Sequence, residues 1–97
     1  MTAGYSLRHR AVAELESIWL NRYRQWGAEH ADQYLRSLLS RFTWLAKNPR
    51  LGKQRADIQS GYYCFPEGMH LIFYTLTRDG SDIIGIPPQH ADTGGDT

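Results

Sequence analysis

The sequence lacks several features that would each point to a particular class of protein. One cysteine, Cys64, excludes an internal disulfide in a chain of 97 residues, and a reducing cytoplasm is the compartment we expect. The formal net charge of only +1 argues against broad nucleic-acid affinity, although a local basic patch is compatible with that total. No apolar run is long enough to cross a bilayer and no segment resembles a signal peptide, so we expect no membrane association.

The composition and length of the chain indicate one folded domain. The 41% hydrophobic content and three tryptophans suit a globular core, and the length allows a single modest one. We expect one domain over residues 1–90. The polar end "ADTGGDT", residues 91–97, lacks apolar anchors and is expected to be a flexible tail.

Two segments have helical period and predict a helical hairpin. The first segment carries apolar residues on one face, at Leu15, Ile18, Trp19, Tyr23 and Trp26. Gly27 is a typical helix stop, and a second apolar stripe runs from about Glu29 to Lys47, where Asn48-Pro49 ends it. Because the link at Gly27 is short, the two helices should be antiparallel.

The remaining segments predict β-strands. Alternation in "GYSLRH" indicates a first strand, and "YYCF", "HLIFYTL" and "DIIGI" indicate three more. The Asp79-Gly80 pair is a strong signal for a tight turn, and Pro87-Pro88 should end the last strand. The predicted fold class is therefore α+β, in the order β-α-α-β-β-β, with the helical hairpin packed on one face of a small antiparallel sheet.

The residues that could carry chemistry lack the companions that catalysis needs. His70 begins a strand beside a turn, where a structural hydrogen bond is the expected role, and it forms no metal-ligand pattern with His90. Cys64 alternates with aromatic neighbours and should be a small buried thiol. Between residues 62 and 86 the only cation among Lys and Arg is Arg78, beside a turn. We therefore expect no catalytic residue, no metal and no cofactor.

The helix faces predict a surface for a protein partner. Leu20 lies about 140° from Leu15 on a helical wheel, and Trp44 lies about 120° from Leu38, so both fall outside their core stripes. Two large apolar side chains on a helical hairpin are what a partner helix would cover, whereas scattered surface hydrophobes are the alternative.

Arg22 is the opposite anomaly, a cation near the middle of the first apolar stripe. It could extend between Trp19 and Trp26, or pair with a carboxylate such as Asp57.

The loop after the second helix gathers four cations, Lys47, Arg50, Lys53 and Arg55. They form either a phosphate-binding patch or a solvated loop, because four charges in this setting attract a polyanion only weakly.

The stretch "NPRLGKQRADIQSGYYCFPEGMHLIFY", preceded by a helix that ends "RQWG", resembles the ParE toxins of bacterial toxin-antitoxin modules, within the RelE/ParE superfamily. The likeness extends from Tyr5 to about Asp92. The pieces that carry it are Trp26-Gly27, Asn48-Pro49, Gly52, Asp57-Ile58, Gly61-Tyr62, Phe65-Pro66, Gly68, His70, Ile72, Phe73 and Tyr74.

The resemblance implies a cytoplasmic toxin that binds DNA gyrase, traps its cleaved-DNA state and is neutralised by a ParD-like antitoxin. It implies no catalytic residue, and contact with operator DNA only through the antitoxin. The candidates for antitoxin binding are Trp19, Leu20, Tyr23, Trp44, Tyr63 and Tyr74. The candidates for gyrase or DNA contact are Lys47, Arg50, Lys53, Arg55, His70 and His90.

The chain departs from the family at four positions where relatives often carry Arg or His. These positions are Gln59, Tyr63, Gly85 and Pro88, and the end of the domain reads "PPQHAD". Two alternatives therefore stay open beside the gyrase poison. One is an attenuated toxin that binds antitoxin without poisoning gyrase, and the other is a RelE-like, ribosome-dependent messenger RNA nuclease.

Overall fold

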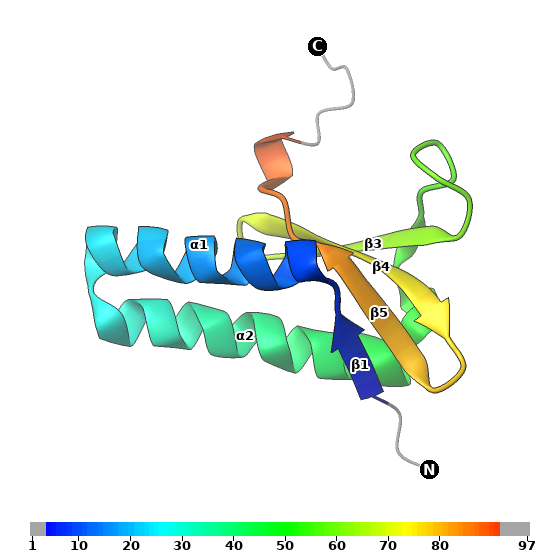
Figure 1. The fold of residues 1–97 in the computed structure, drawn as a ribbon, viewed down its shortest axis with the longest axis horizontal. Helices are drawn as coiled ribbons and strands as arrows, with labels where there is room; N and C mark the ends of the chain where they lie inside the picture. The colour runs from blue at the N-terminus through cyan, green and yellow to red at the C-terminus, as the bar shows by residue number, and fades with distance from the viewer. Residues whose placement is uncertain (1–3, 92–97) are drawn as a thin grey trace.

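The computed structural model describes residues 4–91, which form a layer of two helices packed against one sheet (Figure 1). Helix α1 (His9–Trp26) and helix α2 (Ala28–Lys47) are separated by Gly27 alone. Gly27 has φ 92°, a conformation that favours glycine, and its N–H donates to the carbonyl of Tyr23 at 2.8 Å. The predicted helical hairpin and its stop at Gly27 are confirmed.

The sheet has five strands in the order β1-β5-β4-β3-β2. Strands β3, β4 and β5 are antiparallel, as predicted, but β1 runs parallel to β5, so the sheet is mixed. Two helices, rather than a tight turn, follow β1, and a connection of this length permits parallel pairing. The sequence analysis also missed β2, which has only two residues. The strands are β1 (Gly4–Leu7), β2 (Lys53–Gln54), β3 (Tyr62–Glu67), β4 (His70–Thr77) and β5 (Gly80–Gly85).

Both faces of the sheet carry apolar side chains. The main core lies between the helices and one face, and its largest fully buried members are Tyr74, Phe42, Leu38, Leu45, Ile72, Ile83 and Ile86. On the opposite face Cys64 packs with Phe73 and Ile84 in a smaller cluster. The predicted burial of the Cys64 thiol is therefore confirmed, while its neighbour Tyr63 faces the main core.

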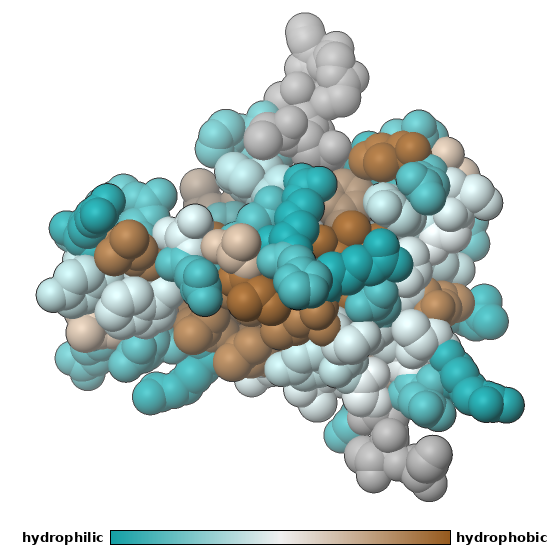
Figure 2. Space-filling view, viewed as in Figure 1, coloured by the Kyte–Doolittle hydropathy of each residue, from teal (hydrophilic) through white to brown (hydrophobic). Residues whose placement is uncertain are grey.

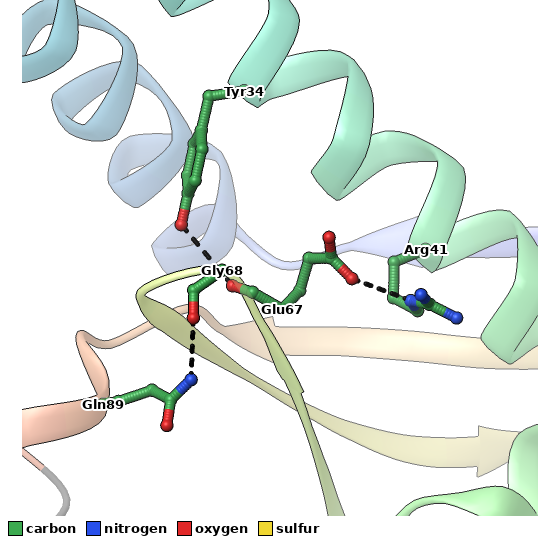
Figure 3. Close-up of polar contacts among 5 residues, drawn as sticks. All are labelled: Tyr34, Arg41, Glu67, Gly68 and Gln89. Atoms are coloured by element: carbon green, nitrogen blue, oxygen red, sulfur yellow. Dashed lines mark hydrogen bonds and ion pairs between the residues drawn. The ribbon is translucent and has the colours of Figure 1, made fainter.

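The turn between β3 and β4 is fastened to α2 and to the segment after β5 (Figure 3). Arg41 of α2 pairs with the Glu67 carboxylate at 2.8 Å, and Gln89 donates to the carbonyl of Gly68 at 2.8 Å. Gly68 has φ 59°, and a Cβ there would lie 2.7 Å from the Tyr34 hydroxyl oxygen. Only glycine fits this turn without displacing Tyr34.

The chain after β5 returns along the start of β4. The Leu71 N–H donates to the carbonyl of Pro87, and the Gln89 N–H donates to the carbonyl of Met69, each at 2.8 Å. The predicted end of the last strand before Pro87-Pro88 is confirmed, and a short 3-10 turn, η2 (Gln89–Ala91), follows. The tail predicted from residue 91 lies almost entirely outside the described residues.

The free end of the helical hairpin extends past the sheet (Figure 1). Tyr23 and Trp26, which the helical period placed in the core stripe, lie toward this end and are 47% and 57% exposed. The stripe is therefore buried only where the sheet lies beneath it. The buried side chains of α1 are Ala11, Leu15 and Ile18, all in its N-terminal part.

Candidate functional site

An apolar groove of about 480 Å³ runs between α1 and α2. Figure 2 shows hydrophobic surface gathered over the middle of the two helices in the view of Figure 1. The residues that line the groove are Val12, Leu15, Glu16, Trp19, Leu35 and Leu39. Glu16 is the single charged member of this set, so the groove offers apolar area rather than polar recognition.

Trp19 is fixed at the side of this groove. Its indole N–H donates to Oδ1 of Asp32 on α2 at 2.8 Å, and its ring stacks on Tyr23 with centroids 5.1 Å apart. The stacked pair and the hydrogen bond restrict the rotamer of Trp19 before any partner arrives. The groove therefore has a wall that needs little ordering on binding.

Leu20 and Trp44 had been predicted to be exposed, and only Leu20 is. Leu20 keeps 41% of its surface exposed on α1. Trp44 is partly buried, with the Phe65 ring centroid 5.2 Å away and the Arg41 guanidinium 4.6 Å from its ring. The helical wheel missed this cover because Phe65 comes from β3 and not from the helix.

Tyr63 and Tyr74 had been predicted to face a partner, but both rings lie in the core, 7% and 0% exposed. Their centroids are 5.7 Å apart. The Tyr74 hydroxyl donates to the carbonyl of Pro49 at 2.8 Å and accepts from the Gly52 N–H at 3.0 Å, and burial raises the pKa of Tyr74 to about 12. Tyr74 therefore anchors the loop after α2 to the sheet and offers no partner surface.

The four loop cations have different surroundings. Lys47, Arg50 and Lys53 are exposed. Arg55 forms an ion pair with Asp57 at 3.0 Å, and hydrogen bonding from Arg55 lowers the pKa of the Asp57 carboxyl. Any phosphate patch on this loop would therefore depend on the three exposed cations.

His70 makes the structural hydrogen bond that its position predicted. Its Nδ1 lies 2.6 Å from the Tyr34 hydroxyl oxygen, which also accepts from the Met69 N–H at 2.9 Å. Partial burial, and then the charge of Arg22, lower the pKa of His70. The Tyr34 hydroxyl also donates to the carbonyl of Glu67 at 3.4 Å. His90 is exposed on the segment after β5.

Arg22 lies against aromatic rings, as its first predicted alternative had it, but the rings are Tyr34 and Trp26 and not Trp19 and Trp26. Its guanidinium carbon lies 3.6 Å from the centre of the Tyr34 ring and 5.3 Å from that of Trp26. The predicted alternative of a pair with Asp57 is wrong, because Asp57 pairs with Arg55.

Within residues 4–90, no group of three or more His, Cys, Asp or Glu side chains could hold a metal ion. In the same part of the chain, neither helix is long and apolar enough to span a membrane. The molecule is thus a small two-layer α+β protein with an apolar groove between its two helices.

Comparisons with known proteins identify the family. The model described as ParE toxin of type II toxin-antitoxin system, parDE, matches residues 5–87, so the chain belongs to the ParE toxin family. A protein named Toxin ParE1 from Mycobacterium tuberculosis is 38% identical over 93 residues, which cover 95% of each chain. Another Toxin ParE1, from Caulobacter vibrioides, is 34% identical over 72 residues, which cover 74% of this chain and 75% of that one.

A solved structure shares the fold. The chain matches a structure titled "Chromosomal ParDE TA system from P. aeruginosa" with a TM-score of 0.75 and 15% identity. The match covers 90% of this chain and 96% of the other. The predicted ParE-type fold and family are therefore confirmed.

Sequence reasoning missed part of the groove. It singled out Trp19 and Leu20 on the first helix, but it treated the apolar residues between Glu29 and Lys47, which include Leu35 and Leu39, as one core stripe. Leu35 and Leu39 are only partly buried and line the groove between the two helices. The signal available was Val12, an apolar residue that the predicted core stripe did not include and that is 42% exposed.

Proposed function

We propose that the chain is a toxin that inhibits DNA gyrase by binding and is neutralised by a ParD-like antitoxin seated in the groove between α1 and α2. The observation that supports the antitoxin site best is the groove itself, an apolar furrow whose lining includes the exposed Val12. An amphipathic helix laying its apolar face into such a groove is a common mode of recognition. Trp19 would be its central anchor, because tryptophan is enriched among the residues that dominate interface energies.

Action by binding rather than catalysis accords with the side chains on the sheet. Metal-free RNA cleavage needs a base, an acid and cations that stabilise the developing phosphorane charge. The face of the sheet opposite the helices instead carries Cys64, Phe73 and Ile84. Arg78, the only Lys or Arg between residues 62 and 86, lies in the turn after β4. A RelE-like nuclease is therefore the weaker alternative.

The attenuated toxin is the stronger alternative. A hollow of about 330 Å³ on the sheet is lined by Ile58, Tyr62, Phe73, Ile84, Gly85 and Pro87, with Arg10 as its single charged residue. Two of the positions where relatives often carry a basic residue, Gly85 and Pro88, lie at or next to this hollow. A protein that kept the antitoxin groove and lost basic side chains at this hollow would still bind antitoxin but would bind gyrase less tightly.

Induced expression in a bacterial host separates these proposals. The chain is expressed alone and together with the small open reading frame expected beside its gene, and viability, filament formation and the DNA damage response are scored. The gyrase proposal predicts filaments and DNA damage signalling that the neighbouring product relieves. Healthy growth with folded protein would favour the attenuated form, and ribosome-dependent cuts in a defined message would favour the nuclease.

A further inference from the structure

A second cleft, of about 610 Å³, lies on the other flank of α1. The turn between β3 and β4 and the segment after β5 form its other walls. The residues that give the cleft its character are Arg10, Glu14, Arg22, Trp26, His70 and His90. None of these belongs to the groove between the helices.

Arg22 is held in this cleft by aromatic rings. Its guanidinium lies over Tyr34 at 3.6 Å and near Trp26 at 5.3 Å. The Tyr34 hydroxyl is itself fixed by the Met69 N–H and by His70. Stacking on aromatic faces leaves the N–H groups of a guanidinium free to point outward in its plane.

Arg22 lacks a counter-charge in the described part of the chain. Among residues 4–90 its guanidinium makes no ion pair and no hydrogen bond. The carboxylate of Glu14 lines the same cleft, but one oxygen binds Arg10 at 3.0 Å and the other accepts from the Ile86 N–H at 2.5 Å. The acid of the cleft is therefore already engaged.

We propose that Arg22 binds a carboxylate side chain from an acidic segment of the antitoxin. This inference rests on the proposed function, and it adds a second, polar anchor to the apolar groove. The planar guanidinium matches a carboxylate through two parallel hydrogen bonds, and its stacking limits the side-chain entropy lost on binding.

The charges of the cleft favour one carboxylate over a polyanion. Arg22 is the only arginine of the cleft without a carboxylate partner among the described residues, so the cleft offers one guanidinium for a single carboxylate and not a row of unpaired arginines for a chain of phosphates. Trp26 and Pro87 give the cleft apolar walls, which suit an acidic side chain with an apolar neighbour. Because α1 borders both the groove and the cleft, one antitoxin chain that crosses α1 could occupy both.

Calorimetric titration of the adjacent-gene antitoxin into purified variants tests the inference. Arg22→Gln should raise the dissociation constant at least tenfold, and Arg22→Lys should recover only part of the loss because lysine lacks the planar fork. Arg24→Gln, on the same helix and exposed, is the matched control and should leave the constant unchanged. An unchanged constant for Arg22→Gln, folded by circular dichroism, would overturn the inference, whereas wild-type protein that does not bind at all would instead overturn the proposed function.

A second measurement identifies the source of the carboxylate. The Nε–H resonance of Arg22 should move when antitoxin is added to the wild-type chain. It should stay in place when Asp92→Asn and Asp96→Asn are introduced into the free chain. A resonance that moves with these two substitutions and not with antitoxin would show that the chain supplies its own carboxylate, and would overturn the inference.

Discussion

The indole N–H of Trp19 on α1 donates a 2.8 Å hydrogen bond to Oδ1 of Asp32 on α2. This bond joins the two helices at the side of the groove. Asp32→Ala should lower the free energy of unfolding by about 1 kcal/mol, because the indole donor loses its protein acceptor. Urea unfolding followed by circular dichroism measures the change.

Asp32→Asn is the control for this bond, since it keeps an oxygen acceptor and removes the charge. We expect it to cost less than Asp32→Ala. An equal cost for both substitutions would mean that the charge of Asp32 near the start of α2 stabilises the protein, and not the bond to Trp19.

Val12 tests whether the groove binds the antitoxin. Val12→Glu places a charge at the groove with little loss of core packing, because Val12 is 42% exposed. We expect antitoxin affinity to fall by at least tenfold, since a carboxylate buried against an apolar helix face lacks a partner. Ala13→Glu adds the same charge to an exposed position of α1 that does not line the groove. Equal affinities of the two variants would contradict the assignment of the groove.

Tyr74 should make the fold less stable at alkaline pH. Its pKa is raised to about 12, above the unfolded value of about 10, so its contribution is present below pH ~10 and lost as pH rises toward 12. Tyr74→Phe should cost about 1–3 kcal/mol at neutral pH, because the Pro49 carbonyl and the Gly52 N–H lose their partner. It should also remove the highest-pH step from the phenolate absorbance titration. If Tyr23→Phe, which removes a hydroxyl from an exposed residue, changed both measurements equally, this account of Tyr74 would fail.

His70 should make the protein less stable in mild acid. Its pKa is lowered in the folded state, so the unfolded state takes up a proton first as pH falls through ~6.5. The free energy of unfolding should therefore decrease from pH ~6.5 down toward the folded pKa. His70→Gln should flatten this part of the curve, and His9→Gln, at an exposed position that does not act on His70, should leave it unchanged. The same slope in all three proteins would rule out His70 as its source.

Local signals predicted the elements well. Gly27 and Asn48-Pro49 marked the helix ends because a positive φ and a proline act on their immediate neighbours. The Asp79-Gly80 pair marked the turn before β5 for the same reason. The parallel pairing of β1 with β5 depends on contacts between residues far apart in the sequence, such as Gly4 with Gly80, and no local signal carries it.

The candidate site was predicted less completely, because exposure depends on where neighbouring elements end. A helical wheel correctly placed Leu20 on the surface. It put Trp26 in the core because a wheel describes one helix and does not include the edge of the sheet. Strand alternation left open which face of β3 is buried, and both faces carry apolar clusters. Tyr63 was therefore predicted to face a binding protein, whereas its ring packs in the main core.

The central claim is that this chain poisons gyrase by binding, and a cleavage assay with purified gyrase, relaxed plasmid and the purified chain tests it most directly. The account predicts linear plasmid that accumulates only when gyrase and the chain are both present, and that disappears when antitoxin is added in excess. When the Val12→Glu variant replaces the wild-type chain, the same amount of antitoxin should no longer protect the plasmid. Plasmid that stays intact at every concentration of folded, antitoxin-binding protein would contradict the claim and leave an attenuated toxin.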